Sequence, residues 1–287
     1  SLRCVVKLAK LQKRLENMSD DELVNLPIIS DAQLKTLELV SVFCTISPLA
    51  GNELVSLMSI LRVVEMSLNN GVAPLTTHAY ASYGMAQAMV GRPNDAFRFG
   101  NIAMRMLQRF NVPPHLKAHT LAVVHGACLH WKEPLSDSIR PLMNAYEEGM
   151  ILGDCKFSFI AAFNYLLSIW CSGINLIQVE EDMRTFCKGL DDMIKNQCAF
   201  KQLMLPFWQM TLNFIGPCRI PHILTGEAMQ EDSFFRDFKN SRFIGGVLSL
   251  KQARLPLAFH FGQLNFAIKC INDLQKDFRL IINHFYS

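Results

Sequence analysis

The residues best suited to chemistry lie within one predicted helix, residues 115–131. His115 and His119 stand four residues apart on one face of this helix, a spacing at which two imidazoles can bind one metal ion. Two ligands do not complete a site, and no acidic residue lies at a suitable offset within the helix. We therefore expect no metal here. An enzyme or metal-binding protein with a histidine site near residues 115–130 is the alternative.

A thiol and an imidazole also occur close together in this stretch, at Cys128 and His130. The two groups of a nucleophilic pair must meet, whereas side chains two positions apart on a helix point in different directions. We expect both residues to be structural. The carboxylate pairs Glu147–Glu148 and Asp191–Asp192 are adjacent in sequence on amphipathic helices, which is typical of a solvated face.

Sequence motifs that bind nucleotides or build familiar catalytic centres are absent from the chain. It contains no G-x-x-x-x-G-K-[ST] phosphate loop, no G-x-S-x-G, no H-E-x-x-H and no kinase H-R-D or D-F-G string. The sequence accordingly predicts no catalytic residue, no cofactor and no metal ligand, and we expect that this segment is not an enzyme.

Composition narrows the class of protein further. A net charge of +3 over 287 residues, without a Lys/Arg run, argues against a nucleic-acid surface. Nine cysteines, an odd number with no C-x-x-C, predict buried thiols in a reducing compartment, and hence a cytoplasmic location. The uncharged stretch 157–179 is long enough to span a bilayer, but a turn at Gly173 would interrupt it. We therefore favour a helix buried by neighbouring helices, and no membrane.

The elements that must position these residues are organised around a predicted helical hairpin, residues 80–107. Gly91 and Pro93 are typical of a helix end followed at once by a helix start, and Gly84 and Gly100 would allow the two helices to cross closely. The second helix is amphipathic. Its predicted inner face carries Ala96, Phe99, Gly100, Ala103, Leu107 and Phe110, and its outer face Arg98, Asn101, Arg105 and Arg109.

Helix signals continue along the rest of the chain. Ser19 precedes two acids, which favours a helix start, and Ser30 to Gln33 has the spacing of a capping box. From residue 216 to 240 the pattern weakens to a loop, with a short helix at 231–239. No segment alternates with a period of two, so we predict no strand. Further helices are expected near 2–18, 31–46, 52–69, 115–131, 135–150, 156–171, 176–194, 200–215, 242–259 and 264–285.

The predicted turns recur at intervals of about forty residues, the length of a two-helix unit. They lie at Gly91, Lys132, Gly173, Gly216 and Gly262. The fold class that follows is all-α, a right-handed stack of antiparallel helical hairpins, that is, a tetratricopeptide-like solenoid. We expect an N-terminal linker helix over residues 1–30, a repeat array over 31–216, and more divergent repeats over 217–287.

Five motifs, which occur in a fixed order along the chain, resemble those of one protein family. They are LPIISD (26–31), GVAPLTTHAYASYG (71–84), FRFGNIAMRMLQRFN (97–111), LHWKEPL (129–135) and AYEEGMILGDCKFS (145–158). Together they resemble the tetratricopeptide-like helical segment of large multidomain signalling proteins. Such proteins carry a serine/threonine-kinase-like domain and an AAA-type ATPase before this segment, and a GAF sensor and a histidine kinase after it. The resemblance covers residues 1–215 well and 216–287 more loosely.

The resemblance implies a non-catalytic regulatory segment, because the nucleotide-binding and phosphotransfer residues of such proteins belong to their other domains. Its partners would be proteins, either neighbouring domains or a docking partner. We expect any partner surface to involve Tyr80, Tyr83, His119 and Trp131 on the first helices of the repeats, provided that these side chains are exposed. Since the sequence begins with Ser1 rather than Met, we also expect a fragment of a longer protein.

Overall fold

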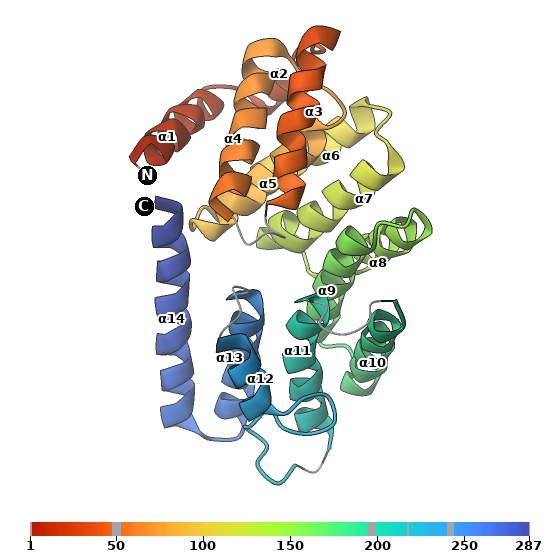
Figure 1. The fold of residues 1–287 in the computed structure, drawn as a ribbon, viewed down its shortest axis with the longest axis vertical. Helices are drawn as coiled ribbons and strands as arrows, with labels where there is room; N and C mark the ends of the chain where they lie inside the picture. The colour runs from red at the N-terminus through yellow and green to blue at the C-terminus, as the bar shows by residue number, and fades with distance from the viewer. Residues whose placement is uncertain (1, 48–52, 194–198, 217, 240–243, 287) are drawn as a thin grey trace. The chain divides into compact units, whose positions relative to one another are not determined.

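The computed structural model describes residues 2–47, 53–193, 199–216, 218–239 and 244–286, and over these residues it consists of helices joined by turns and loops. Within them, strand-like pairing is limited to two isolated bridges, Ile28 with Val72 and Thr225 with Gln230. The all-α prediction is confirmed. The elements in chain order (Figure 1) are α1 (Leu2–Glu16), α2 (Asp20–Val24), α3 (Asp31–Ile46), α4 (Glu53–Asn70), α5 (Thr76–Met89), α6 (Pro93–Arg109), α7 (Pro114–Val123), η1 (Val124–Cys128), η2 (Leu129–Trp131), α8 (Ser136–Ile151), α9 (Cys155–Cys171), α10 (Leu176–Met193), α11 (Ala199–Ile215), α12 (Glu231–Lys239), α13 (Ile244–His260) and α14 (Leu264–Tyr286).

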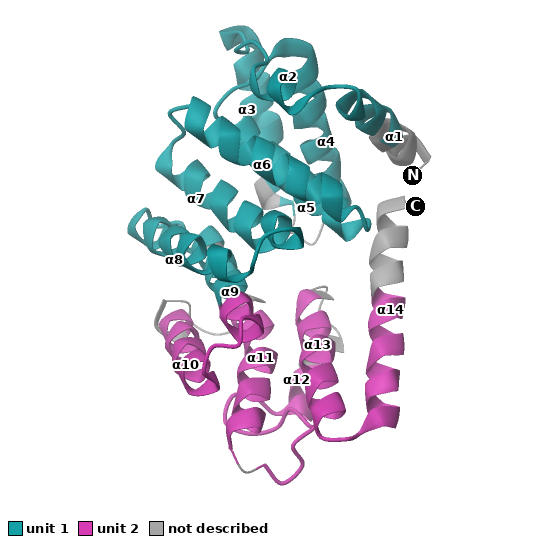
Figure 2. Ribbon diagram, turned by 180° about the vertical axis from the view of Figure 1, so that it is seen from behind, with its two compact units in different colours: residues 1–165, 282–287 teal, residues 166–281 magenta. Residues whose placement is uncertain are grey.

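The chain divides into two compact units (Figure 2). Unit 1 comprises residues 1–165 and 282–287, and unit 2 comprises residues 166–281. Helix α9 begins in the first unit and ends in the second. The boundaries that the sequence suggested, after residues 30 and 216, stay predictions.

Two predicted helix starts differ in how they are capped. Ser19 forms a complete capping box with Glu22, and the backbone N–H that Ser19 donates to the carboxylate (2.7 Å) lowers the pKa of Glu22. Ser30 precedes α3 as expected, but its side chain accepts no backbone hydrogen bond. Its hydroxyl points instead to the side-chain oxygen of Gln33, 3.4 Å away. The spacing of Ser30 and Gln33 therefore predicted the helix start correctly, but the capping box predicted from it does not form.

The central hairpin forms as predicted from α5 and α6. Gly91 takes a left-handed φ of 79°, and Pro93 is the first residue of α6. A Cβ on Gly100 would lie 2.6 Å from the Cβ of Cys128, and one on Gly84 would lie 3.0 Å from its sulfur. Both glycines thus mark the place where α5, α6 and η1 approach one another too closely for a side chain.

The other recurrent turns also separate helices in the structure. Gly173 and Gly262 have left-handed φ values of 74° and 72°, between α9 and α10 and between α13 and α14. Lys132 follows η2, and Gly216 follows α11. After Gly216 the regular pattern stops, because the described residues 218–230 form an irregular segment before the short α12.

The stretch 115–131 is not the single α-helix that the sequence predicts. The α-helical part ends at Val123 and is followed by a π-helical turn, η1, and a 3₁₀ turn, η2. The amide of Asn164 on α9 donates to the carbonyl of Ala122 (3.4 Å), and a Cβ on Gly126 would lie 2.1 Å from the nitrogen of that amide. A side chain that enters the hydrogen-bond ladder in this way accounts for the widened turn.

The uncharged stretch 157–179 is divided between α9 and α10 by the turn at Gly173. Neither helix, nor any other helix among the described residues, combines the length and apolar character needed to cross a bilayer. The alanines of α7, α8 and α9 instead pack in a small cluster of Ala122, Ala145 and Ala161.

We predict opposite effects for two glycine-to-alanine substitutions. Gly100→Ala forces a methyl group onto the Cβ of Cys128, which cannot move without its backbone, so the free energy of unfolding should fall by about 1–3 kcal/mol. Gly189→Ala is the control, because this glycine lies inside α10 with nothing within 4 Å of the position that its new methyl group would take. It should gain about 0.5–1 kcal/mol. Urea unfolding followed by circular dichroism measures both. Equal effects of the two changes would contradict the close crossing.

Candidate functional site

The structure places two of the four residues expected at a partner surface inside the core. Tyr80 is 0% exposed and Tyr83 1%, because α5 is contacted by α4, α6, α7 and η1. The hydroxyl of Tyr80 lies 3.0 Å from that of Ser67, and burial raises the pKa of Tyr80 to about 12. Tyr83 packs edge-on against Phe99. Both tyrosines therefore have a core role, and this corrects the surface that the sequence suggested.

The other two residues differ from each other. His119 is largely buried, whereas Trp131 is 46% exposed at the end of η2. The indole N–H of Trp131 donates to the carbonyl of Ala127 (3.2 Å), and its ring lies 5.1 Å from that of His130. Of the expected surface, Trp131 is the residue that presents a large aromatic face to solvent.

His119 belongs to a cluster that brings together three distant parts of unit 1. Its Nε2 is hydrogen-bonded to the carboxylate of Asp154, and its ring stacks on Phe157 with centroids 3.5 Å apart. His78 of α5 lies edge-on to both rings, at 5.9 Å from His119 and 5.5 Å from Phe157. Asp154 also accepts the backbone N–H of Phe157 (3.3 Å), at the start of α9. The cluster joins α5, α7 and α9 through polar and aromatic contacts.

The four histidines between residues 115 and 130 do not all meet at one site. The ring of His115 lies edge-on to that of His119, with centroids 5.9 Å apart, whereas His125 and His130 have other neighbours. His125 is buried within hydrogen-bond reach of Ser138 (3.4 Å), and burial lowers the pKa of His125. His130 is part-buried beside Trp131. Across the part of the chain that the structure describes, no three His, Cys, Asp or Glu side chains are grouped so that they could hold a metal ion.

Cys128 occupies a structural position rather than a reactive one. Its thiol donates to the carbonyl of Ala81 (3.6 Å) at the crossing with Gly84 and Gly100, and burial raises the pKa of Cys128 to about 12. A thiol with this pKa is protonated at neutral pH and is a poor nucleophile. The seven cysteines whose side chains are described form no disulfide with one another.

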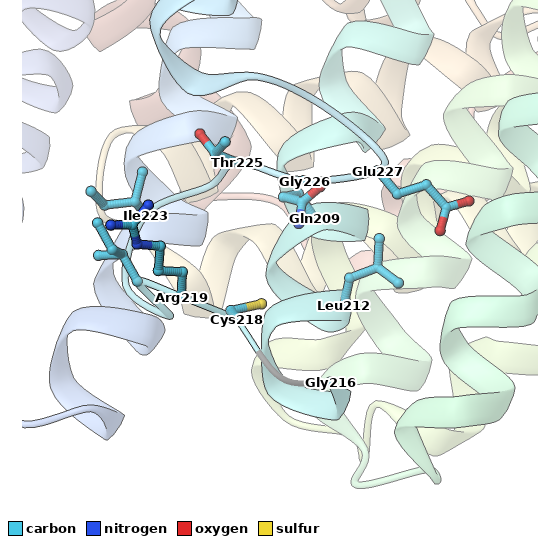
Figure 3. Close-up of a pocket in the computed structure, with 10 residues that line it drawn as sticks. Gln209, Leu212, Gly216, Cys218, Arg219, Ile223, Thr225, Gly226 and Glu227 are labelled. Atoms are coloured by element: carbon cyan, nitrogen blue, oxygen red, sulfur yellow. The ribbon is translucent and has the colours of Figure 1, made fainter.

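A pocket of about 530 Å³ lies in unit 2, between the C-terminal half of α11 and the irregular segment that follows it (Figure 3). Figure 3 shows Leu212 on the α11 side of this pocket, and Arg219 and Ile223 on the opposite side. The residues that line it are Gln209, Leu212, Gly216, Cys218, Arg219, Ile220, Ile223, Thr225, Gly226 and Glu227.

Two buried amides on α11 hold the irregular segment in place. Asn213 donates to the carbonyls of Pro221 (3.1 Å) and Ile223 (2.7 Å), and its oxygen accepts from Gln209 (2.7 Å). The oxygen of Gln209 accepts the backbone N–H groups of Ala228 (2.9 Å) and Met229 (3.4 Å). The amides thus satisfy backbone groups of a segment that has no secondary structure of its own.

Ion pairs hold the C-terminal end of the same segment. Arg184 of α10 pairs with both Glu180 and Glu227, and Glu180 also accepts the indole N–H of Trp208 (2.9 Å). Glu231 accepts the backbone N–H of Leu224 (2.9 Å) and pairs with Arg254 of α13. The pocket is therefore built on contacts to three helices, α10, α11 and α13.

The lining of this pocket is mixed in character. Apolar side chains make up much of its walls, and the loop adds polar side chains, namely the thiol of Cys218 and those of Arg219, Thr225 and Glu227. The thiol is directed to the side-chain oxygen of Asn213 (3.3 Å), an amide that cannot serve as a base. The sequence pattern predicts a loop here and no pocket. The available signal was Gln209 and Asn213, two amides four residues apart in the largely apolar stretch 203–215.

A second pocket of about 540 Å³ lies in unit 1, where the end of α6, the start of α7 and the end of α8 meet. Lys117 and Glu148 line it together with apolar residues. Among those, Ile151 has an unusually exposed side chain, at 85%. This surface can receive an apolar group, with one charge of each sign at its edge.

Comparison with known proteins gives one informative likeness. No protein-family model and no solved structure matches the chain. The chain is 27% identical over 111 residues to hybrid signal transduction histidine kinase G of Dictyostelium discoideum. That match covers 38% of this chain but only 3% of the relative. This likeness and the all-helical fold fit a helical segment of a signalling protein.

Removal of one buried amide should loosen the segment that covers the pocket. Gln209→Ala leaves the N–H groups of Ala228 and Met229 without their acceptor, at a cost of about 1–3 kcal/mol. Amide hydrogen exchange across 218–230 should accelerate, and Cys218 should react faster with a thiol reagent.

The matched control is Gln230→Ala in the same segment. Its exposed side chain donates one hydrogen bond, to the carbonyl of Gly226 (3.1 Å), so exchange should stay within about twofold of the unaltered protein. If Gln209→Ala behaves like this control, the amides do not hold the segment.

Acid should destabilise unit 1 through His125. Its pKa is lowered in the folded state, so the unfolded chain binds more protons once the pH falls below about 6.5. This contribution to stability is present above pH 6.5 and is lost as the pH falls through the folded-state pKa. His125→Gln can still meet Ser138 but does not titrate, so its unfolding temperature should depend less on pH between 7 and 5. An unchanged pH dependence would exclude His125 as a cause.

Proposed function

We propose that this chain is a non-catalytic helical-repeat segment of a multidomain signal-transduction kinase. The observation that carries the proposal is the likeness to the Dictyostelium histidine kinase, of which the match occupies a very small part. Because the sequence carries no phosphate loop and no kinase motif, we assign the catalytic steps to other parts of such a protein. Each of the two described pockets has a lining in which apolar side chains accompany a few charged ones, which is compatible with a binding role.

In this proposal the hairpins form a tetratricopeptide-like, right-handed array. The support is local: α3 packs on α4, α5 on α6, α7 on α8 and α10 on α11, and the turns recur at nearly constant intervals. An array of this kind joins its neighbours in sequence and presents long surfaces to partners. The segment would couple an ATPase-type module to a sensor or output domain, or dock a protein partner.

The proposed partner is a protein, in the reducing cytoplasm. A net charge of +3 does not favour nucleic acid, and described thiols that form no disulfide suit a reducing compartment. Trp131 on η2 and the apolar pocket beside Ile151 are the surfaces in unit 1 that a partner could cover. Large exposed apolar side chains next to a pocket are typical of interaction sites.

The proposal predicts that purified residues 1–287 are strongly helical by circular dichroism and hydrolyse no ATP above the buffer background. The physical reason is that the sequence lacks a phosphate-binding loop. ATP turnover that follows the protein through two different chromatographic steps would contradict the non-catalytic role.

Sequencing of the transcript on both sides of this segment tests the signalling assignment independently. Kinase and phosphate-loop motifs before Ser1, and a sensor or transmitter domain after Ser287, would support a segment that couples domains. A reading frame that starts and stops close to these residues would overturn that assignment while leaving the helical fold intact.

A further inference from the structure

The sequence pattern predicts that the arginines on the outer side of α6 face solvent. In the structure they stay partly exposed, but they also contact other groups of the chain. They lie against the chain's own N-terminal residues 15–26, which contain the end of α1 and all of α2. We call residues 11–26 the strap. The arginine face consists of Arg92, Arg98, Arg105 and Arg109.

Carboxylates of the strap meet these arginines in order along the helix. Glu16 pairs with Arg92 at 2.8 Å, and Asp20 pairs with Arg98 at 2.6 Å. Asp21 pairs with Arg105, one turn or more further along α6. Acidic residues that come later in the strap therefore contact arginines that come later in α6, so the two run in register.

Backbone carbonyls of the strap form a second set of contacts. Arg98 donates to the carbonyls of Leu15 (3.1 Å) and Met18 (2.5 Å), at the end of α1. Arg109 donates to the carbonyls of Val24 and Leu26, at the end of α2. The last carbonyls of a helix lack partners within it, so the arginines cap both short helices.

Apolar side chains anchor the strap from the other side. Leu11, Leu15, Leu23 and Val24 are at most 6% exposed and pack into the core of unit 1. The segment that lies on the arginine face thus has three properties: acids at a fixed spacing, carbonyl groups at or just after helix ends, and leucines on the opposite face.

We propose that the arginine face of α6 is a binding surface for acidic, leucine-bearing helical segments, and that the strap occupies it as a ligand in cis that opens as a unit. Three of its ion pairs are at least partly exposed, with Asp21 80% and Glu16 47% exposed, so salt screens them. Opening of the strap should therefore depend on salt concentration more strongly than opening of α5 does. This inference does not depend on the signalling function.

The first experiment uses the unaltered protein. Amide hydrogen exchange of residues 15–26 and of α5 is followed at 20 mM and at 500 mM NaCl. Exchange of the strap should accelerate about tenfold with salt, whereas that of α5 should change less than twofold. If salt changes the exchange rates of the strap and of α5 by the same factor, the proposal is overturned.

Charge-reversal variants then test the pairing between Arg105 and Asp21. Arg105→Glu places like charges opposite Asp21 and should accelerate strap exchange several-fold, and adding Asp21→Arg should restore it. Arg62→Gln is the matched control, because Arg62 pairs with Glu65 of its own helix, α4, and should leave the strap unchanged. If the amide hydrogens of the strap exchange as fast in the double variant as in Arg105→Glu alone, the pairing is contradicted.

Binding in trans tests the surface. A fluorescein-labelled peptide of residues 9–29 should bind the full chain carrying Asp20→Lys and Asp21→Lys at least tenfold more tightly than the unaltered chain, because that strap is weakened while the arginines are intact. The same peptide with Asp20 and Asp21 changed to Asn should bind at least tenfold less tightly. If both peptides bind with equal affinity, the arginine face is not selective for acidic segments. If neither peptide binds, the face is not a binding surface for them.

Discussion

The close crossing of α5, α6 and η1 is the constraint on which the rest of unit 1 depends. At this point the backbones of Gly84 and Gly100 lie against Cys128, with no space for a further methyl group at Gly100. Helices that approach so closely can enclose Tyr80 and Tyr83 on α5. The same contact fixes the rotation of α6, so that its apolar side faces the core and its arginines face the N-terminal strap.

Polar side chains fix irregular parts of the backbone in both units: a loop in unit 2, and a helix start and a widened helical turn in unit 1. In unit 2, Gln209 and Asn213 supply hydrogen bonds to the backbone of residues 221–229. In unit 1, Asp154 meets His119 and the first turn of α9, and Asn164 reaches the widened turn of η1. Because a buried polar group without a partner is costly, such contacts specify one position of the loop and disfavour the alternatives.

These features are compatible with the role that we propose, a segment that positions other domains. The fold and the likeness to a Dictyostelium histidine kinase fit a helical segment of a signalling protein. The strap on α6 is then of interest because it lies on the N-terminal side of the central hairpin. If it opens as a unit, events on that side could reach the arginine face directly, without unfolding the core.

The amino-acid sequence alone predicts the helical class, the central hairpin and the turns at Gly91, Gly173 and Gly262, because helix periodicity and left-handed glycines are local properties. It did not determine which aromatic residues are exposed, what covers the arginines of α6, or where residues 115–131 leave the α-helix. Each of these depends on a residue far away in the chain: Phe99 against Tyr83, Asp20 against Arg98, and Asn164 against Gly126. The pocket in unit 2 likewise needs Gln209 and Asn213 to meet a later segment. Only tertiary structure decided these contacts, since burial and hydrogen bonding between distant elements leave no fixed spacing in the sequence.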